Sequence, residues 1–119
     1  MDIVFYDRNG KPCAYSEDGT HIYLYSGKPV AHIEENSIFS YLGKHLGWLE
    51  DGWVRDNDGF CVFFTDNCSG GPSKPFKKSK PFKGFKSFRP FKGFKNFKPF
   101  RRSKKNSWSD IDAKDFFVE

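Results

Sequence analysis

The chain has 119 residues and a net charge of +5, which leaves room for one or two small domains. The charge is unevenly divided: residues 1–72 carry net −6, residues 73–105 carry net +14 with no acid, and residues 106–119 carry net −3. No apolar run approaches the roughly 20 residues of a membrane helix, and the first residues do not resemble a secretory signal. The three cysteines are odd in number and do not have the spacing of a disulfide framework, which favours a reducing compartment, so we expect a cytoplasmic protein.

Residues 1–69 contain four copies of a repeat, which align on one glycine in each copy. These glycines are Gly10, Gly27, Gly43 and Gly59. Five residues before each glycine the side chain is apolar: Phe5, Ile22, Ile38 and Val54. Five residues after each glycine the side chain has an aromatic ring: Tyr15, His32, Trp48 and Phe64. Seven residues after each glycine it is acidic: Glu17, Glu34, Glu50 and Asp66. Apolar positions two residues apart indicate short strands on both sides of each glycine.

Each repeat predicts one β-hairpin, because Asn9-Gly10 and Asp58-Gly59 suit tight turns with positive φ. Asp18-Gly19 and Asp51-Gly52 supply turns between the repeats. We therefore expect an all-β meander of eight short antiparallel strands, in which four pseudo-symmetric hairpins close into a small barrel or petal-like ring. Large rings should supply most of its thin core: Tyr15, Phe39, Trp48, Trp53 and Phe63.

Gly-Gly-Pro at residues 70–72 ends the repeats and is interpreted as a hinge. The sequence of residues 73–105 then has a period of three, within a nine-residue super-period of prolines at 72, 81, 90 and 99. A helix would spread the phenylalanines around its circumference and a strand would alternate them between two faces, whereas polyproline II aligns them in one ridge. We therefore predict a polyproline-II-like arm with a phenylalanine ridge beside a cation ridge.

A straight arm of residues 73–105 would span about 100 Å at about 3.1 Å per residue, far beyond a domain of this size. We expect the phenylalanine ridge to be buried against other copies, a folded-back turn at Gly84 or Gly93, its own domain or a partner, so that Phe88→Asp or Phe91→Asp destabilises the protein. A solvated, disordered linker is the alternative. Residues 106–119 are expected to dock as an acidic aromatic C-terminal anchor, with a frayed terminus as the alternative.

Several segments resemble a known family. They are residues 6–12, 26–31, 43–48, 50–53, the Gly-Gly-Pro at 70–72 and the Ser-Trp-Ser at 107–109. They are similar to segments of the bacterial four-fold β-flower domain proteins, and the resemblance covers nearly the whole chain. It implies a β-hairpin fold but no activity and no catalytic residues. The chain departs from the family where phenylalanine replaces the smaller aliphatic residues of the tail.

No pattern indicates catalysis or a metal site. The histidines at 21, 32 and 45 fall in different repeat positions, no cysteine pair has a metal-ligand spacing, and residues 56–59 lack the later glutamate of a calcium loop. The repeated acids are interpreted as a solvated face, and Cys13 as a small buried hydrophobe. We expect no enzyme activity, no metal, no cofactor and no small-molecule substrate.

Two non-enzymatic functions remain, and the first is structural self-assembly into a homo-oligomer. The Phe-Lys-x arm would pack against other copies or its own domain through aromatic residues: Phe76, Phe82, Phe85, Phe88, Phe91, Phe94, Phe97, Phe100, Trp108, Phe116 and Phe117. This function ranks first, because a phenylalanine at every third position fits a packed ridge better than it fits nonspecific stacking on nucleic-acid bases.

In the alternative, the arm binds single-stranded nucleic acid or an anionic lipid surface weakly through its cations. The cations are Lys83, Lys86, Arg89, Lys92, Lys95, Lys98 and Arg101. These charges could instead be neutralised inside the protein, by the acidic domain and by Asp110, Asp112 and Asp115.

Overall fold

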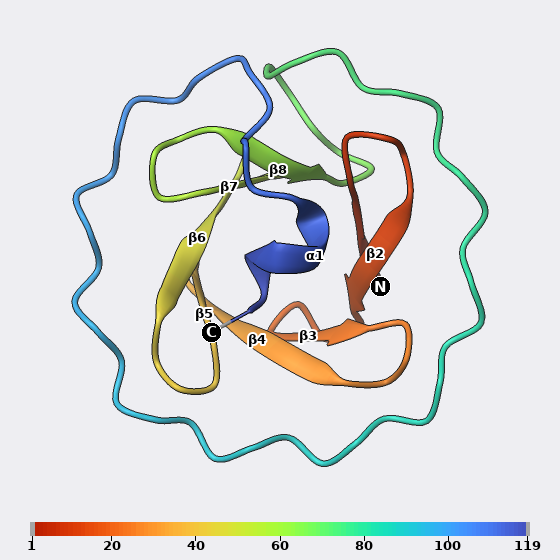
Figure 1. Ribbon diagram of the computed structural model, residues 1–119, viewed down its shortest axis with the longest axis vertical. Helices are drawn as coiled ribbons and strands as arrows, with labels where there is room; N and C mark the ends of the chain where they lie inside the picture. Colours follow the sequence, from red (N-terminus) through yellow and green to blue (C-terminus); the bar gives the residue numbers. More distant parts are fainter. Residues whose placement is uncertain (1, 119) are drawn as a thin grey trace.

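The computed structural model describes residues 2–118, which form eight strands and one short helix. The elements are β1 (Ile3–Tyr6), β2 (Pro12–Ser16), β3 (His21–Leu24), β4 (Pro29–Glu34), β5 (Ser37–Phe39), β6 (His45–Glu50), β7 (Trp53–Arg55), β8 (Cys61–Phe64) and α1 (Ala113–Phe116). Strands adjacent in sequence pair antiparallel, and β8 returns to β1 through the Tyr6–Phe64 pair, so the sheet closes into a barrel (Figure 1). The predicted meander of four hairpins is confirmed.

The four hairpins share their turn and their irregularity. The repeat glycines all have positive φ, between +81° and +101°, in the region that only glycine enters readily. The register of each hairpin shifts at the same repeat position, for example between Phe5 and Tyr6 and between Ile22 and Tyr23. A bulge increases the local twist and bends the strand, which helps such short strands to close into a barrel.

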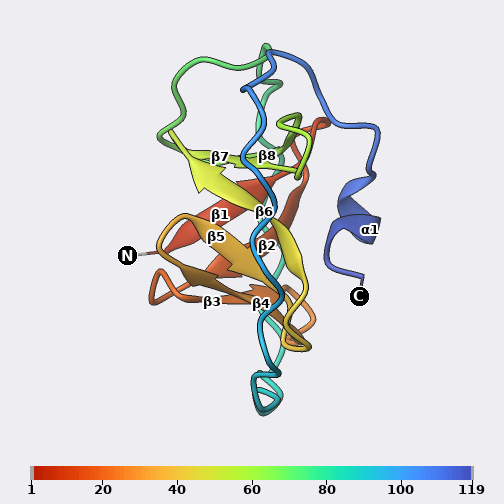
Figure 2. The ribbon, with the colours of Figure 1, turned by 90° about the vertical axis from the view of Figure 1, so that its left-hand side faces the viewer.

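The barrel interior holds one apolar core. Four repeat-related residues, Phe5, Ile22, Ile38 and Val54, are buried there. The fourth repeat places Phe63 where the first two place Ala14 and Ala31, so a single large ring occupies space that small residues leave open. Helix α1 lies across one end of the barrel (Figure 2). From it Phe116, which is 4% exposed, packs edge-on against Phe63 with ring centroids 5.6 Å apart.

The other face of the strands carries a second buried layer, which we call the outer aromatic layer. It consists of Tyr6, Tyr15, Tyr23, Tyr25, His32, Phe39, Tyr41, His45, Trp48, Trp53 and Phe64. Side chains alternate between the two faces of a strand, so Tyr15 points outwards where its neighbour Ala14 points inwards. The predicted core aromatics are all buried, but only Phe63 lies inside the barrel.

Residues 73–105, which we call the belt, encircle the barrel and contain neither helix nor strand (Figures 1 and 2). The protein is 35 Å across, so its circumference of about 110 Å is close to the roughly 100 Å that the belt spans as polyproline II. The arm is therefore not straight: the chain curves around its own barrel, one of the two packing partners that were expected for it. No helix in residues 2–118 is long and apolar enough to cross a membrane.

Candidate functional site

The belt has three faces, and each face recurs at every third residue. Its eight phenylalanines point away from the barrel and are 94–101% exposed; we call them the phenylalanine rim. The cation that follows many of these phenylalanines lies against the barrel, and residues at the third position donate backbone N–H groups to it. This three-residue period without helix or strand is what the predicted polyproline-II-like arm requires.

Each hairpin turn holds the belt by a backbone hydrogen bond. The belt donors are nine residues apart: the amides of Lys78, Ser87, Asn96 and Lys105 donate to the carbonyls of Gly10, Gly27, Gly43 and Gly59 at distances of 2.8, 3.0, 2.8 and 3.1 Å. Two further belt amides, of Gly84 and Gly93, donate to the carbonyls of Tyr25 and Tyr41 at 2.7 and 2.6 Å. One nine-residue unit of the belt therefore matches one hairpin of the barrel.

The repeat glycines are required by the belt as well as by the turns. A Cβ on Gly27 would lie 2.6 Å from the carbonyl carbon of Phe85, and closer still to its oxygen. A Cβ on Gly43 would lie 2.7 Å from the same atom of Phe94. Gly19, which also has a positive φ, would meet no atom within 4 Å. The turn role of these glycines was predicted from the sequence, but their contact with the belt was not.

The repeated acids pair with belt lysines that are also nine residues apart. The pairs are Asp66 with Lys77, Glu17 with Lys86, Glu34 with Lys95 at 2.7 Å, and Glu50 with Lys104 at 4.0 Å. Arg101 adds a closer bond to Glu50, at 2.8 Å, and the Glu50 side chain is only 12% exposed. The interpretation of these acids as a solvated face holds for Glu17 and Asp66, which are exposed, but it missed that all four acids pair with belt cations.

Belt cations also cover the outer aromatic layer. The distances from the cation to the ring centroid are 4.4 Å for Lys83 over Tyr15, 5.6 Å for Lys95 over Phe39 and 4.3 Å for Arg101 over Trp48. A cation over a ring face is attracted by the negative charge of the π-electrons. The lysine stems also cover ring surface, while the charged ends reach the acids. Part of the layer is therefore covered by cationic side chains.

The pairing changes the titration of the acids. Hydrogen bonds from Lys83 and Lys86 hold the pKa of Glu17 below its usual value. The hydrogen bond from Lys95 lowers the pKa of Glu34 in the same way. Both carboxylates remain charged at neutral pH, so the contacts between belt and barrel persist there.

The phenylalanines that were expected to be buried are exposed in the single chain, and the cations that were expected beside them face inwards. Burial of the rim against its own domain is therefore wrong. The physical reason is that the outer aromatic layer and the repeated acids offer the cations a complementary surface. Contact between the rim and other copies stays a prediction.

The predicted polyanion site is largely occupied by the barrel. Among its cations, Lys83, Lys86, Lys95 and Arg101 bind barrel acids, and Arg89 donates to the Tyr23 hydroxyl at 3.3 Å. Within residues 2–118, Lys92 and Lys98 have no acidic partner. Five of the seven cations are therefore engaged by the barrel.

Three aromatic residues predicted for self-assembly pack on the chain's own barrel, one of the two packing partners expected for them. Trp108 lies edge-on to Trp53, with centroids 5.5 Å apart, while Phe116 and Phe117 both contact Phe63. The hydroxyl of Ser109 donates to the Asp56 carboxylate at 2.5 Å. Of the internal pairing that was considered as an alternative, the structure shows the part with the acidic domain, whereas the acids at 110, 112 and 115 make no ion pair within residues 2–118.

His32 is buried under the belt without a hydrogen-bond partner for either ring nitrogen within residues 2–118. Its ring packs against Phe39 and Tyr41, with centroids 5.9 and 5.4 Å away, and its Nδ1 is 3.6 Å from a Glu34 oxygen. Burial, followed by the charge of Lys92, lowers its pKa. The imidazole is therefore neutral at neutral pH and acts there as a packing residue.

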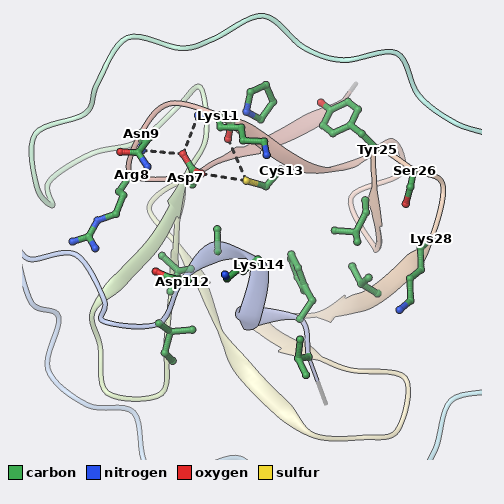
Figure 3. Close-up of a pocket in the computed structure, with 18 of the residues that line it drawn as sticks. Asp7, Arg8, Asn9, Lys11, Cys13, Tyr25, Ser26, Lys28, Asp112 and Lys114 are labelled. Carbon is green, nitrogen blue, oxygen red and sulfur yellow. Dashed lines mark hydrogen bonds between the residues drawn. The ribbon is translucent and has the colours of Figure 1, made fainter.

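A groove of about 1020 Å³ opens beside α1 (Figure 3). Its lining includes Cys13, Val30 and Val62, which share the repeat position three residues after the glycine. The Cys13 thiol donates to the Asp7 carboxylate at 3.6 Å and to a backbone carbonyl at 3.3 Å. Burial, followed by the charge of Asp7, raises the pKa of Cys13 to about 12. The thiol is therefore protonated at neutral pH and is a poor nucleophile.

Within residues 2–118, no three side chains of the types that bind metals lie close enough to hold an ion. Comparisons with curated proteins and with solved structures find no match. A family model described as 4-fold beta flower protein matches residues 3–117, a range that takes in the barrel, the belt and α1. The predicted resemblance is thus confirmed, and the chain belongs to the 4-fold beta flower protein family.

Proposed function

We propose that this is a structural, non-enzymatic protein whose phenylalanine rim associates with the rims of other copies. The observation that carries this proposal is the exposure of eight phenylalanine side chains, each at 94% or more. Extended apolar surface on a folded chain marks an interaction site. Burying one such ring contributes about 1.5–3 kcal/mol, so covering even a part of the rim favours association.

The spacing of the rim suits a second rim. Successive rings on a polyproline II chain lie about 9 Å apart. A ring inserted midway from a neighbouring copy would lie about 4.5 Å from each, at the short end of the 4.5–7 Å range of aromatic pairs. Two rims can therefore interdigitate, which supports a second copy as the partner.

The charge distribution supports the same partner. The belt is strongly basic, and two bare basic belts would repel each other. Belt cations pair with barrel acids on the inner face, which lowers the charge that one rim presents to another. The barrel thus neutralises part of the belt charge, while the phenylalanines point outwards.

The shape of the rim sets the strength of association. Because the belt is convex, two rims meet along a short arc and bury only a few rings from each copy (Figure 1). Such a contact is far smaller than the roughly 1,600 Å² of a stable interface. Four similar quadrants nevertheless allow each copy to bind several neighbours. We expect weak, concentration-dependent oligomers.

Static light scattering over a range of protein concentrations tests the proposal. The wild-type mass should rise with concentration, at both low and high salt. A variant with all eight rim phenylalanines changed to serine should stay at the monomer mass of 13.8 kDa. Leu42→Ser is the matched control, because Leu42 is 75% exposed but lies outside the belt. A monomeric wild type, or equal masses for wild type and rim variant, would contradict the proposal.

Binding to single-stranded nucleic acid is a second candidate, because exposed rings can stack on bases. The inward direction of most paired cations disfavours it, since phosphate binding needs accessible charge. A salt titration of single-stranded DNA binding separates the two functions. Affinity that falls steeply with salt and is weakened by Lys92→Gln with Lys98→Gln would favour nucleic acid. Absence of binding at low salt would exclude it.

A further inference from the structure

We propose that the groove beside α1 binds a small anionic amphiphile, a molecule with an apolar body and a carboxylate head. The groove is formed by the β1–β2 and β3–β4 turns on one side and by residues 108–118 on the other (Figure 3). Its volume of about 1020 Å³ lies at the upper end of the range for small-molecule sites. This site is separate from the phenylalanine rim and does not depend on the function proposed for it.

The apolar part of the groove exists because α1 covers the barrel end incompletely. Four repeat-related apolar residues belong to the barrel core or pack against it: Cys13, Val30, Leu46 and Val62. Helix α1 has only four residues, and its Phe116 packs over Phe63. Leu46 lines a separate hollow with Phe116, which leaves Cys13, Val30 and Val62 to the open groove. Leu24 and Phe117 extend this surface, so the groove can hold an apolar body.

The polar edge of the groove has an excess of positive charge. Two hairpin turns and α1 contribute Arg8, Lys11, Lys28 and Lys114, all of them exposed (Figure 3). In contrast to many belt cations, none of the four has an acidic partner within residues 2–118. Cations around an apolar hollow attract an anionic head group.

The acids at the groove do not cancel this charge. The Asp7 carboxylate is already satisfied, since it accepts the amides of Asn9 and Lys11 at 2.9 Å each and the Cys13 thiol. Asp112 is the other acid in the lining, so the cations outnumber the acids by two. The same excess disfavours a rim segment of another copy, whose phenylalanines are followed by lysines. A free anionic amphiphile is therefore the occupant that the groove fits.

Titration calorimetry on the full chain tests this site, with dodecanoate below its micelle concentration as the probe. Dodecanoate should bind. Acetate, which lacks the apolar body, and dodecyltrimethylammonium, which carries a positive charge, should bind more weakly. Lys11→Gln combined with Lys28→Gln should weaken dodecanoate binding about tenfold or more, because charged hydrogen bonds are lost. Lys44→Gln is the matched control: Lys44 has the same repeat position in the third hairpin but lies outside this groove. Its affinity should change by less than about twofold.

The rim variant with eight serines shows where dodecanoate adsorbs. Retained binding in that variant supports the groove, whereas loss of binding there would assign the effect to the phenylalanines and overturn the proposal. Equal affinity for dodecanoate and dodecyltrimethylammonium would also overturn it, as would an unchanged affinity in the double lysine variant. The three substituted lysines, Lys11, Lys28 and the control Lys44, are all exposed, so these variants should fold like the wild type.

Discussion

The substitution Gly27→Ala should lift one quadrant of the belt from the barrel. Its new Cβ would overlap the backbone of Phe85, which belongs to the belt and cannot rotate away as a side chain could. Gly19→Ala is a matched control, because Gly19 has a similar φ of +77° against +97° but open space around it. The difference between the two variants isolates contact with the belt from strain in the turn.

The size of this difference follows from the bonds that the belt would lose. Alanine in the left-handed region costs about 1–2 kcal/mol, and this term is common to both variants. At Gly27 the belt must also release its bonds from the Gly84 amide to Tyr25 and from the Ser87 amide to Gly27. Each bond contributes about 1 kcal/mol net, so Gly27→Ala should be about 2 kcal/mol less stable than Gly19→Ala. For a domain of this size that corresponds to a Tm lower by about 8 °C.

Thermal unfolding followed by circular dichroism gives the Tm values, and amide hydrogen exchange shows where the structure opens. In the wild type and in Gly19→Ala, the Ser87 and Gly84 amides should be protected. In Gly27→Ala both should exchange rapidly, while amides inside the strands keep their protection. Equal Tm values for the two variants, together with a protected Ser87 amide in Gly27→Ala, would refute the proposed contact between glycine and belt.

Three further predictions concern the core, the rim and pH. Phe116→Ala should lower the free energy of unfolding by about 3–5 kcal/mol in urea titrations, because its ring is buried, whereas Phe97→Ala at 99% exposure should change it by less than about 0.5 kcal/mol. Burial lowers the pKa of His32 and His45 in the folded protein. The unfolded chain therefore takes up protons first, so the free energy of unfolding should fall as the pH drops below the unfolded-state pKa of 6.5. In urea titrations between pH 7.5 and 5.5, His32→Gln should flatten this dependence. The lowered pKa values of Glu17 and Glu34 predict a second loss below the unfolded-state value of 4.5, seen as faster exchange of belt amides, and unchanged belt protection at pH 3 would contradict it.

Hairpins and arm could be predicted from the sequence because each has its own period. Turn glycines and alternating apolar residues define the strands, and a phenylalanine at every third position excludes both helix and strand for the arm. The two periods also correspond, since four prolines (Pro72, Pro81, Pro90 and Pro99) accompany four repeat glycines. The equal number of hairpins and of nine-residue belt units is the sequence signal that the belt wraps the barrel.

The prediction of which belt face is buried was wrong, and the reason is physical. Phenylalanine is the more apolar residue, so its burial was expected, and the cations were predicted to form a ridge beside it. In the structure, Lys86 reaches Glu17 and lies over the outer aromatic layer, which a phenylalanine could not do with an acid beside it. The groove could not be predicted at all. It depends on how much of the barrel end the four residues of α1 cover, and no local pattern encodes that area.

The central claim is that residues 73–105 wrap their own barrel, and small-angle X-ray scattering of the dilute monomer tests it most directly. The radius of gyration of the Cα atoms is 13.4 Å when the belt is closed. A released, flexible segment 73–119 would have a root-mean-square end-to-end distance of about 35–40 Å, and would enlarge the particle accordingly. A measured radius of gyration close to the closed value, with a compact distance distribution, is the predicted result. A long tail in that distribution and a radius above about 20 Å would contradict it.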